Sequence, residues 1–153
     1  MTKSNTEVKV QTEVKVRIMV DADLPRLNEI DRLIQGEDRV TTWPYSLETY
    51  RTIYNPNLTL VCEVDGEVMG FLVGYILTPP THSKRVGWIE MLGVHPESQN
   101  KGVGRLLVEK FHEECRRNDA VVNCLVRLND ETLAKFYVSL GFKPFDFVIY
   151  TKQ

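Results

Sequence analysis

The stretch that decides the fold reads Trp88-Ile89-Glu90-Met91-Leu92-Gly93-Val94-His95-Pro96-Glu97-Ser98-Gln99-Asn100-Lys101-Gly102-Val103-Gly104-Arg105. Its first half completes an apolar strand predicted over Val86–Val94, and this strand leads into a loop with two glycines two positions apart. A helix is predicted from Gly104 to about Arg117, because apolar residues recur there at helical spacing. We expect its buried face to comprise Val103, Leu106, Leu107, Phe111 and Cys115.

The start of this helix is a candidate anion site. The first N–H groups of a helix have no intrahelical partner, and they attract phosphate. Gly102 and Gly104 allow close approach to the backbone, while Lys101 and Arg105 add positive charge. A P-loop would need Ser or Thr after Gly-Lys, and a Rossmann fingerprint would need Gly or Ala where Leu107 stands, so neither fits. By itself a Gly-x-Gly also fits an ordinary turn.

Two strands and a hairpin turn are predicted before this stretch. Residues 58–64 and 67–77 flank Asp65-Gly66, a strong signal for a tight antiparallel hairpin because glycine accepts the positive φ of a type I′ turn. Farther upstream, residues 12–20 alternate apolar and polar side chains, which predicts another strand.

Two helices are predicted between that first strand and the hairpin. The first is capped by Asp21 or Asp23, contains Pro25 in its first turn and ends at Gly36. Its buried stripe is expected to be Leu27, Ile30 and Ile34. The second runs from about Ser46 to just before Pro56, and an aromatic loop over residues 40–45 joins the two.

The chain after the glycine loop predicts a strand, a helix and a strand. Residues 121–126 form a short apolar run, as in a strand buried at a sheet centre. Asn129 or Asp130 caps a helix that Gly141 ends, with Leu133, Phe136, Tyr137 and Leu140 on one stripe. Residues 145–150 supply the last strand. The resulting order of strands and helices is that of a mixed α/β or α+β single domain.

Composition excludes several classes of protein. The chain has 153 residues, 42% of them hydrophobic and 26% charged, which is the average for one soluble domain. Its net charge of -2, without a basic block, argues against nucleic-acid or membrane-surface partners. The scattered Cys62, Cys115 and Cys124 suit neither a disulfide framework nor a metal site, so we expect a cytoplasmic protein without a bound metal. No apolar run is long enough to span a bilayer.

The motifs resemble those of the GCN5-related N-acetyltransferase (GNAT) family. Residues 99–104 look like the Gln/Arg-x-x-Gly-x-Gly/Ala signature of that family, and they follow an apolar strand. A second match runs from Asn129 through Tyr137 to Leu140-Gly141-Phe142. The order of elements from Arg17 to Tyr150 also agrees. The resemblance makes residues 13–153 an acetyltransferase domain, and leaves residues 1–12 as a tail or an extra strand.

The resemblance implies a twisted, mostly antiparallel mixed sheet, splayed between its fourth and fifth strands and flanked by four helices. It also implies acetyl-CoA as cosubstrate, with pyrophosphate at the glycine loop and pantetheine along the preceding strand. Backbone N–H groups near Leu92 and Gly93 would face the thioester carbonyl. The implied cofactor residues are Met91, Leu92, Gly93, Val94, Gln99, Asn100, Lys101, Gly102, Val103, Gly104, Arg105, Asn129, Lys135 and Tyr137.

Direct transfer to an amine needs a base, and the leaving thiolate benefits from an acid. The resemblance points to Glu90 as the base, expected on the same strand face as Leu92, although it could instead only form an ion pair. Tyr137 is the expected acid, with an ordinary pKa near ~10 against ~8.5 for a thiol. A core-packing role is its alternative. The family's acceptor pocket would be walled by Trp43, Tyr45 and Tyr75.

The acceptor has two possible classes. A small-molecule amine is favoured, and a protein N-terminus or lysine is the alternative, since residues 129–142 also resemble the ribosomal-protein N-terminal acetyltransferases. Cys124-Leu125 departs from that subgroup, which tends to have Glu there. A noncatalytic acetyl-CoA-binding module is a third hypothesis. Homodimers are common in the family.

Overall fold

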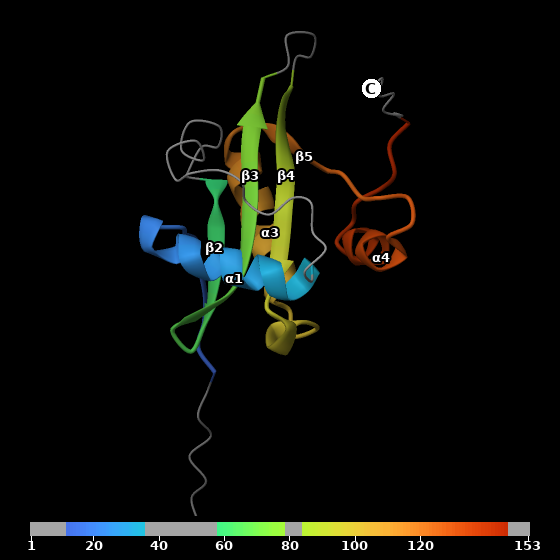
Figure 1. Ribbon diagram of the computed structural model, residues 1–153. Helices are drawn as coiled ribbons and strands as arrows, with labels where there is room; N and C mark the ends of the chain where they lie inside the picture. Colours follow the sequence, from blue (N-terminus) through green and yellow to red (C-terminus); the bar gives the residue numbers. More distant parts are fainter. Residues whose placement is uncertain (1–11, 36–57, 79–83, 147–153) are drawn as a thin grey trace, which may run out of the picture.

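The computed structural model describes residues 12–35, 58–78 and 84–146 (Figure 1). Its sheet has five strands in the order β1-β2-β3-β4-β5, namely Val14–Ile18, Leu60–Val64, Glu67–Leu77, Arg85–Val94 and Ala120–Cys124. The first four strands pair antiparallel, whereas β5 lies parallel to β4. This is the mixed, mostly antiparallel sheet that the family resemblance implies.

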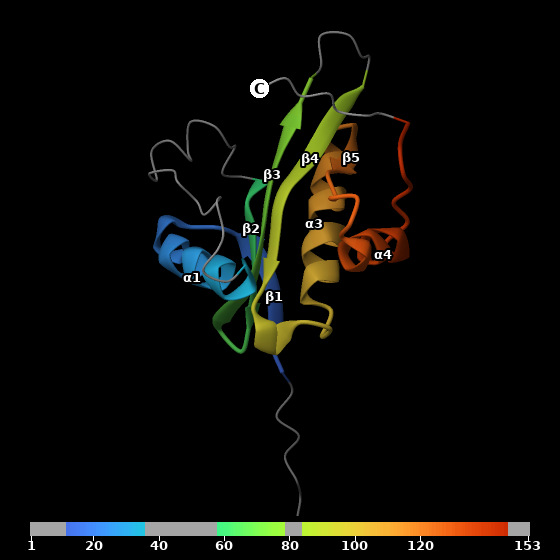
Figure 2. The ribbon, with the colours of Figure 1, turned by 45° about the vertical axis from the view of Figure 1, so that its right-hand side comes forward.

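Three α-helices and two short 3-10 turns accompany the strands in the described residues. They are η1 (Asp21–Asp23), α1 (Leu24–Gln35), η3 (Pro96–Ser98), α3 (Val103–Arg117) and α4 (Glu131–Ser139). Helix α1 covers one face of the sheet and α3 the other, with α4 beside α3 (Figure 2). None of these helices is long and apolar enough to cross a membrane.

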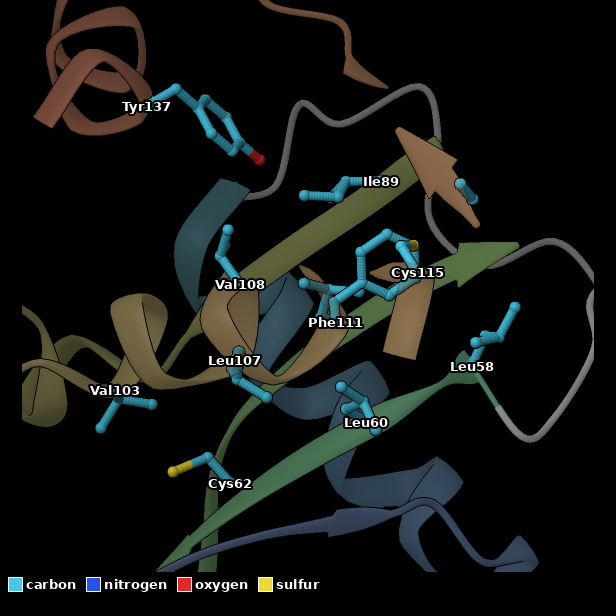
Figure 3. Close-up of a cluster of buried hydrophobic side chains, with 12 residues drawn as sticks. Leu58, Leu60, Cys62, Ile89, Val103, Leu107, Val108, Phe111, Cys115 and Tyr137 are labelled. Atoms are coloured by element: carbon cyan, nitrogen blue, oxygen red, sulfur yellow. The ribbon is translucent and has the colours of Figure 1, made fainter. Parts of the chain in front are cut away.

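Each face of the sheet has its own apolar core. Leu27 and Ile30 of α1 pack with Phe71 and Val73 of β3, and all four are almost fully buried. On the other face, a larger cluster joins α3 to the sheet and to Tyr137 of α4 (Figure 3). The α3 side of this cluster is Val103, Leu107, Val108, Phe111 and Cys115. The predicted stripes of both helices are therefore confirmed, except that Val108 replaces Leu106, which is 39% exposed.

The sheet splits between β4 and β5. Pairing runs from Arg85 with Ala120 to Ile89 with Cys124, and there β5 ends. Strand β4 continues to Val94 without a β5 partner, so the edge of its second half is open in the described sheet. The predicted splay is confirmed, and its vertex lies at Ile89 and Cys124.

A β-bulge sits at this vertex. Val73 pairs with Met91 and Gly74 pairs with Ile89, so Glu90 is an extra residue on β4. Ile89 and Leu92 both contact the α3 core, whereas Met91 contacts the α1 core. The bulge places Glu90 toward Tyr75, on the α1 face. The expectation that Glu90 shares a face with Leu92 is wrong, because simple alternation fails across one inserted residue.

The turns confirm several local predictions. Asp65 and Gly66 have φ of 51° and 83°, as the hairpin turn requires. Asp130 is the cap of α4 and accepts a 2.9 Å hydrogen bond from the Leu133 N–H. Gly141, with φ of 89°, follows the end of that helix. Asp23 precedes α1, but its carboxylate binds Arg17 and the Val20 N–H.

The end of the chain differs from the prediction. Strand β5 ends at Cys124 rather than Val126, and within the described sheet it is the last strand, beside β4, with Val121 exposed. Phe145 lies in no strand. The second predicted helix, the aromatic loop, residues 147–150 and the first eleven residues fall outside the described part of the chain.

Candidate active site

The glycine loop presents backbone donors at the start of α3. Asn100 and Gly102 adopt positive φ of 60° and 87°, which turns the chain sharply into the helix. The Leu106 N–H makes the first helical bond, 3.0 Å to the Gly102 carbonyl, and no side chain caps the helix. The N–H groups of Val103, Gly104 and Arg105 therefore precede the helical ladder and form the donor set expected for a phosphate.

The side chains of this loop have distinct contacts. The Gln99 amide donates 3.1 Å to the Val94 carbonyl, which ties the loop to the end of β4. Val103 is buried in the α3 core, so only its backbone can face a ligand. Lys101 is exposed, and Arg105 makes a long 3.5 Å ion pair with Glu109. Such exposed pairs are weak, so both cations can turn to an anion at little cost.

The open edge of β4 supplies a second set of donors. The His95 N–H donates 2.8 Å to the Met69 carbonyl, which makes these two residues a hydrogen-bonded pair. Pairs alternate along an antiparallel ladder, so Gly93 directs its backbone groups to Phe71 on β3. Leu92 and Val94 direct theirs away from β3, toward the split. Of the two expected donors to a thioester carbonyl, Leu92 thus fits and Gly93 does not.

Gly93 has a packing role instead. A Cβ at this position would come within 2.5 Å of the Phe71 ring and within 3.2 Å of Ile34. Its lack of a side chain lets α1 approach the sheet beside the split.

Tyr137 carries the second functional group into the split. Its ring is 5% exposed, and it is held edge-on between Phe136 and Phe142 at centroid distances of 5.2 and 5.1 Å. The hydroxyl points from α4 toward Ile89 of β4 (Figure 3). Its partner is the sulfur of Cys124, the last residue of β5. The sequence treats Cys124 as a small hydrophobe, but in the fold it touches the expected acid.

Burial and the Cys124 sulfur together raise the pKa of Tyr137 well above its usual range. Burial likewise raises the pKa of the Cys124 thiol to about 11. Both groups are therefore neutral near pH 7. The Tyr137 hydroxyl therefore carries its proton at the start of the reaction, as the expected acid role requires. The geometry suits donation of a hydrogen bond that stabilises the thiolate.

Glu90 lies on the other face of the sheet, in a small cavity. The Tyr75 hydroxyl donates a long 3.4 Å hydrogen bond to the Glu90 carboxylate. Burial first, and Glu90 second, raise the pKa of Tyr75, which keeps it a neutral donor. The cavity holds about 230 Å³ and is lined by Tyr75, Trp88, Ile89, Glu90 and Leu125.

A second, larger hollow lies between β5 and α4. It holds about 660 Å³, and Cys124 and Tyr137 both line it. Trp88 and Leu125 belong to both hollows, so the two meet near the vertex of the split. A carboxylate on one face and a phenol hydroxyl on the other thus flank the place where β4 and β5 separate.

The remaining predicted residues lie in different settings. Asn129 is exposed before α4, and Lys135 forms an exposed 3.4 Å pair with Glu131. Trp43 and Tyr45 fall outside the described residues. Sequence reasoning missed Trp88 and Leu125, although Trp88 stands two residues before Glu90 and Leu125 follows the end of β5. In the parts of the chain that the structure describes, no three acidic, His or Cys side chains form a group that could hold a metal.

Comparisons with known proteins agree with this geometry. Residues 24–142 match the model of the acetyltransferase (GNAT) family. An acetyltransferase of Sodalis glossinidius, SG1711, is 28% identical over 97 residues, which cover 63% of this chain and 64% of that protein. This chain thus matches just under two thirds of that relative's length. Another relative, ECA0875 of Pectobacterium atrosepticum, is 25% identical over 65% of this chain and 67% of its own.

Solved structures share the fold. The aminoglycoside N-acetyltransferase AAC(6')-Iy in complex with CoA aligns with a TM-score of 0.75 and 18% identity, covering 95% of this chain and 98% of its own. Naa50 of Arabidopsis thaliana, in complex with the bisubstrate analogue CoA-Ac-MVNAL, aligns with a TM-score of 0.69 and 19% identity over 87% and 85% of the two chains. Together with the split sheet and the glycine loop, the family match shows that the chain belongs to the acetyltransferase (GNAT) family.

Proposed function

We propose that this protein transfers an acetyl group from acetyl-CoA directly to the amine of a small molecule. The observation that carries the proposal is the split between β4 and β5, with Glu90 on one face and the Tyr137 hydroxyl on the other. Two substrates can meet there from opposite sides. Family membership and the CoA-bound neighbours support the choice of cosubstrate.

The residues divide the binding of acetyl-CoA between the two donor sets. The N–H groups that open α3, with Lys101 and Arg105, bind the pyrophosphate. The open edge of β4 pairs with the pantetheine amides, and the Leu92 N–H donates to the thioester carbonyl. Gln99 holds the loop against Val94. Asn129 and Lys135, on the α4 side, contact the same cosubstrate.

The reaction then needs a proton removed and a thiolate stabilised. Glu90 accepts a proton from the acceptor ammonium, directly or through water, and the freed nitrogen attacks the thioester carbon. As the C–S bond breaks, Tyr137 donates a hydrogen bond to the sulfur, which leaves as thiolate and takes its proton from solvent. The Leu92 N–H stabilises the carbonyl oxygen during the attack.

The role of Glu90 is tested by Glu90→Gln. Turnover should fall most below neutral pH, where free amine is scarce and a base matters most. Glu67→Gln, at the far hairpin end of β3, is the matched control because it removes an exposed carboxylate outside the cavity, together with a surface ion pair to Arg26 that contributes little to stability. A pH–rate profile identical to that of the unmodified protein would remove Glu90 from the mechanism.

Two other functions remain to be separated from this one. A peptide N-terminus is the alternative acceptor, favoured by the likeness to Naa50 and by residues 129–142. A noncatalytic module would bind acetyl-CoA without turnover. Isothermal titration with acetyl-CoA, followed by thiol release with a panel of amines and peptides, distinguishes the three. Failure to bind acetyl-CoA would refute enzyme and module alike.

We also propose an intracellular homodimer. The three cysteines are all unpaired, with Cys62 and Cys115 buried, which fits a reducing compartment. Size-exclusion chromatography with light scattering tests the dimer, and a monomeric mass at micromolar concentration would refute it.

A further inference from the structure

The cavity beside Glu90 has walls that select among amines. Tyr75 and Trp88 are register partners on β3 and β4, so their rings stand side by side on the α1 face. Leu125 adds aliphatic surface, whereas the Ile89 side chain packs in the α3 core on the other face, so this residue lines the cavity through its backbone. Apart from the Glu90 carboxylate and the Tyr75 hydroxyl, the named side chains are apolar or present an aromatic surface.

The charge of the cavity matches one cation. Glu90 is the single carboxylate in the described lining, and it can pair with one ammonium. A second ammonium on the same molecule would meet Leu125 or an aromatic edge, where the described lining offers it no counterion.

The aromatic pair favours the reactive ammonium itself. A cation over the face of Trp or Tyr is attracted by the ring quadrupole, more strongly where water is excluded. The apolar body of the acceptor can then lie against Leu125. The same wall that attracts the charged end thus receives a hydrocarbon group behind it.

The volume limits the size of that group. The cavity of about 230 Å³ is smaller than the ~300–1,000 Å³ that encloses drug-sized ligands. It holds one compact arm of a molecule rather than several sugar rings.

From these observations we propose that the acceptor is a compact primary amine with a single positive charge on an aryl or branched-alkyl group. The inference rests on the proposed function, since it names the substrate class of the same site. It also separates this protein from polycationic acceptors such as aminoglycosides.

The first test compares amines of matched size. Thiol release by the full chain is measured with isoamylamine and with 1,4-diaminobutane, which have the same number of non-hydrogen atoms but a branched methyl end and a second ammonium, respectively. Phenethylamine tests the aryl group, spermidine and neamine test polycations, and a short peptide tests a protein acceptor. We expect kcat/KM to be about tenfold or more higher for isoamylamine and phenethylamine than for diaminobutane.

The second test changes the charge of the wall. Leu125 is 67% exposed, so Leu125→Asp places a carboxylate in the lining without opening the core. This variant should raise the ratio of kcat/KM for diaminobutane to that for isoamylamine by about tenfold. Leu125→Asn, similar in size but neutral, is the control and should leave the ratio within about threefold.

The outcomes distinguish a failure of the proposed acceptor class from a failure of the proposed acetyltransferase function. Preference for spermidine, neamine or the peptide, with compact monoamines poor, overturns the inference and leaves the acetyltransferase activity standing. Equal ratios in the Asp and Asn variants also overturn it. Acetyl-CoA binding without thiol release from any acceptor overturns the proposed function and the inference together.

Discussion

Tyr137→Phe separates the chemical role of the tyrosine from its packing role. The ring is almost fully buried between Phe136 and Phe142, and the variant keeps that ring. It removes only the hydroxyl and its hydrogen bond to Cys124. A neutral hydrogen bond is worth about 0.5–1.5 kcal/mol, and sulfur is a weak partner, so we expect a loss of at most about 1 kcal/mol. For a chain of this size that lowers Tm by about 2–4 °C.

The expected effect on the rate is larger than the effect on stability. A hydrogen bond to a charged group is worth about 1.5–3 kcal/mol, and the departing thiolate is charged only as the C–S bond breaks. Loss of this bond should lower the rate of acetyl transfer by about 10- to 150-fold. Single-turnover thiol release at saturating acetyl-CoA isolates the chemical step, and thermal unfolding followed by circular dichroism reports stability. The KM for acetyl-CoA should stay within about twofold.

The matched control is Thr132→Ala, which also removes one hydroxyl but at an exposed position of the same helix, outside the lining of the hollow. It should leave the single-turnover rate unchanged. If Tyr137→Phe retained a rate within about threefold of the unmodified protein while Tm fell, the tyrosine would be a packing residue, and the hydrogen bond to thiolate would have no part in the reaction.

Three further perturbations test the loop and the buried groups. Gly102 has φ of 87° and open space around a Cβ, so Gly102→Ala adds about 1–2 kcal/mol of backbone strain and should weaken acetyl-CoA binding measured by calorimetry. The control is Gly66→Ala, with φ of 83° at the hairpin, which should lose similar stability while its affinity for acetyl-CoA stays unchanged. Burial raises the pKa of Cys115 from 9.0 to about 11, so its contribution to folding stability is fully present below pH 9, and about 2–3 kcal/mol is lost as pH rises through 11. In urea unfolding, the free energy of unfolding of Cys115→Ala should fall less steeply with pH in this range than that of the unmodified protein. Equal pH slopes would contradict the assignment. Arg17 lowers the pKa of Asp23, so this carboxylate stabilises the fold fully above its ordinary pKa of 3.8 and less as pH falls through the lowered pKa. Asp23→Asn should lower the free energy of unfolding at pH 7 by about 2 kcal/mol and make that free energy less dependent on pH in acid, whereas unchanged stability would refute the contribution.

The sequence predicts most of the described fold because its local signals agree with one another. The Asp65-Gly66 turn determines the hairpin, and helical spacing places Leu27 and Ile30 in one core and Leu107 and Phe111 in the other. The end of the strand after α3 is harder to predict. Leu125 and Val126 continue the apolar run, but β5 ends at Cys124, because the length of a strand depends on pairing with residues far away in the chain.

The candidate site likewise has parts that the sequence predicts and parts that it does not. The glycine loop depends on local backbone geometry, so Gly102 and the start of α3 could be read from the residues in order. The contact between Tyr137 and Cys124 joins a helix to the end of a strand, and nothing in the spacing of the two residues predicts it. Only their common position at the vertex of the split, visible once β5 is paired with β4, explains it.

One inserted residue decides how the two faces of the site are used. With strict alternation, Glu90 would share a face with Leu92, beneath α3, where Leu107 and Val108 exclude water. A carboxylate in that core would be costly to ionise and remote from a solvated amine. The bulge moves Glu90 to the side of Tyr75 and leaves Leu92 on the α3 side. The base can therefore meet an acceptor on one face while Tyr137 serves the sulfur on the other, and the open edge of β4 lies between them.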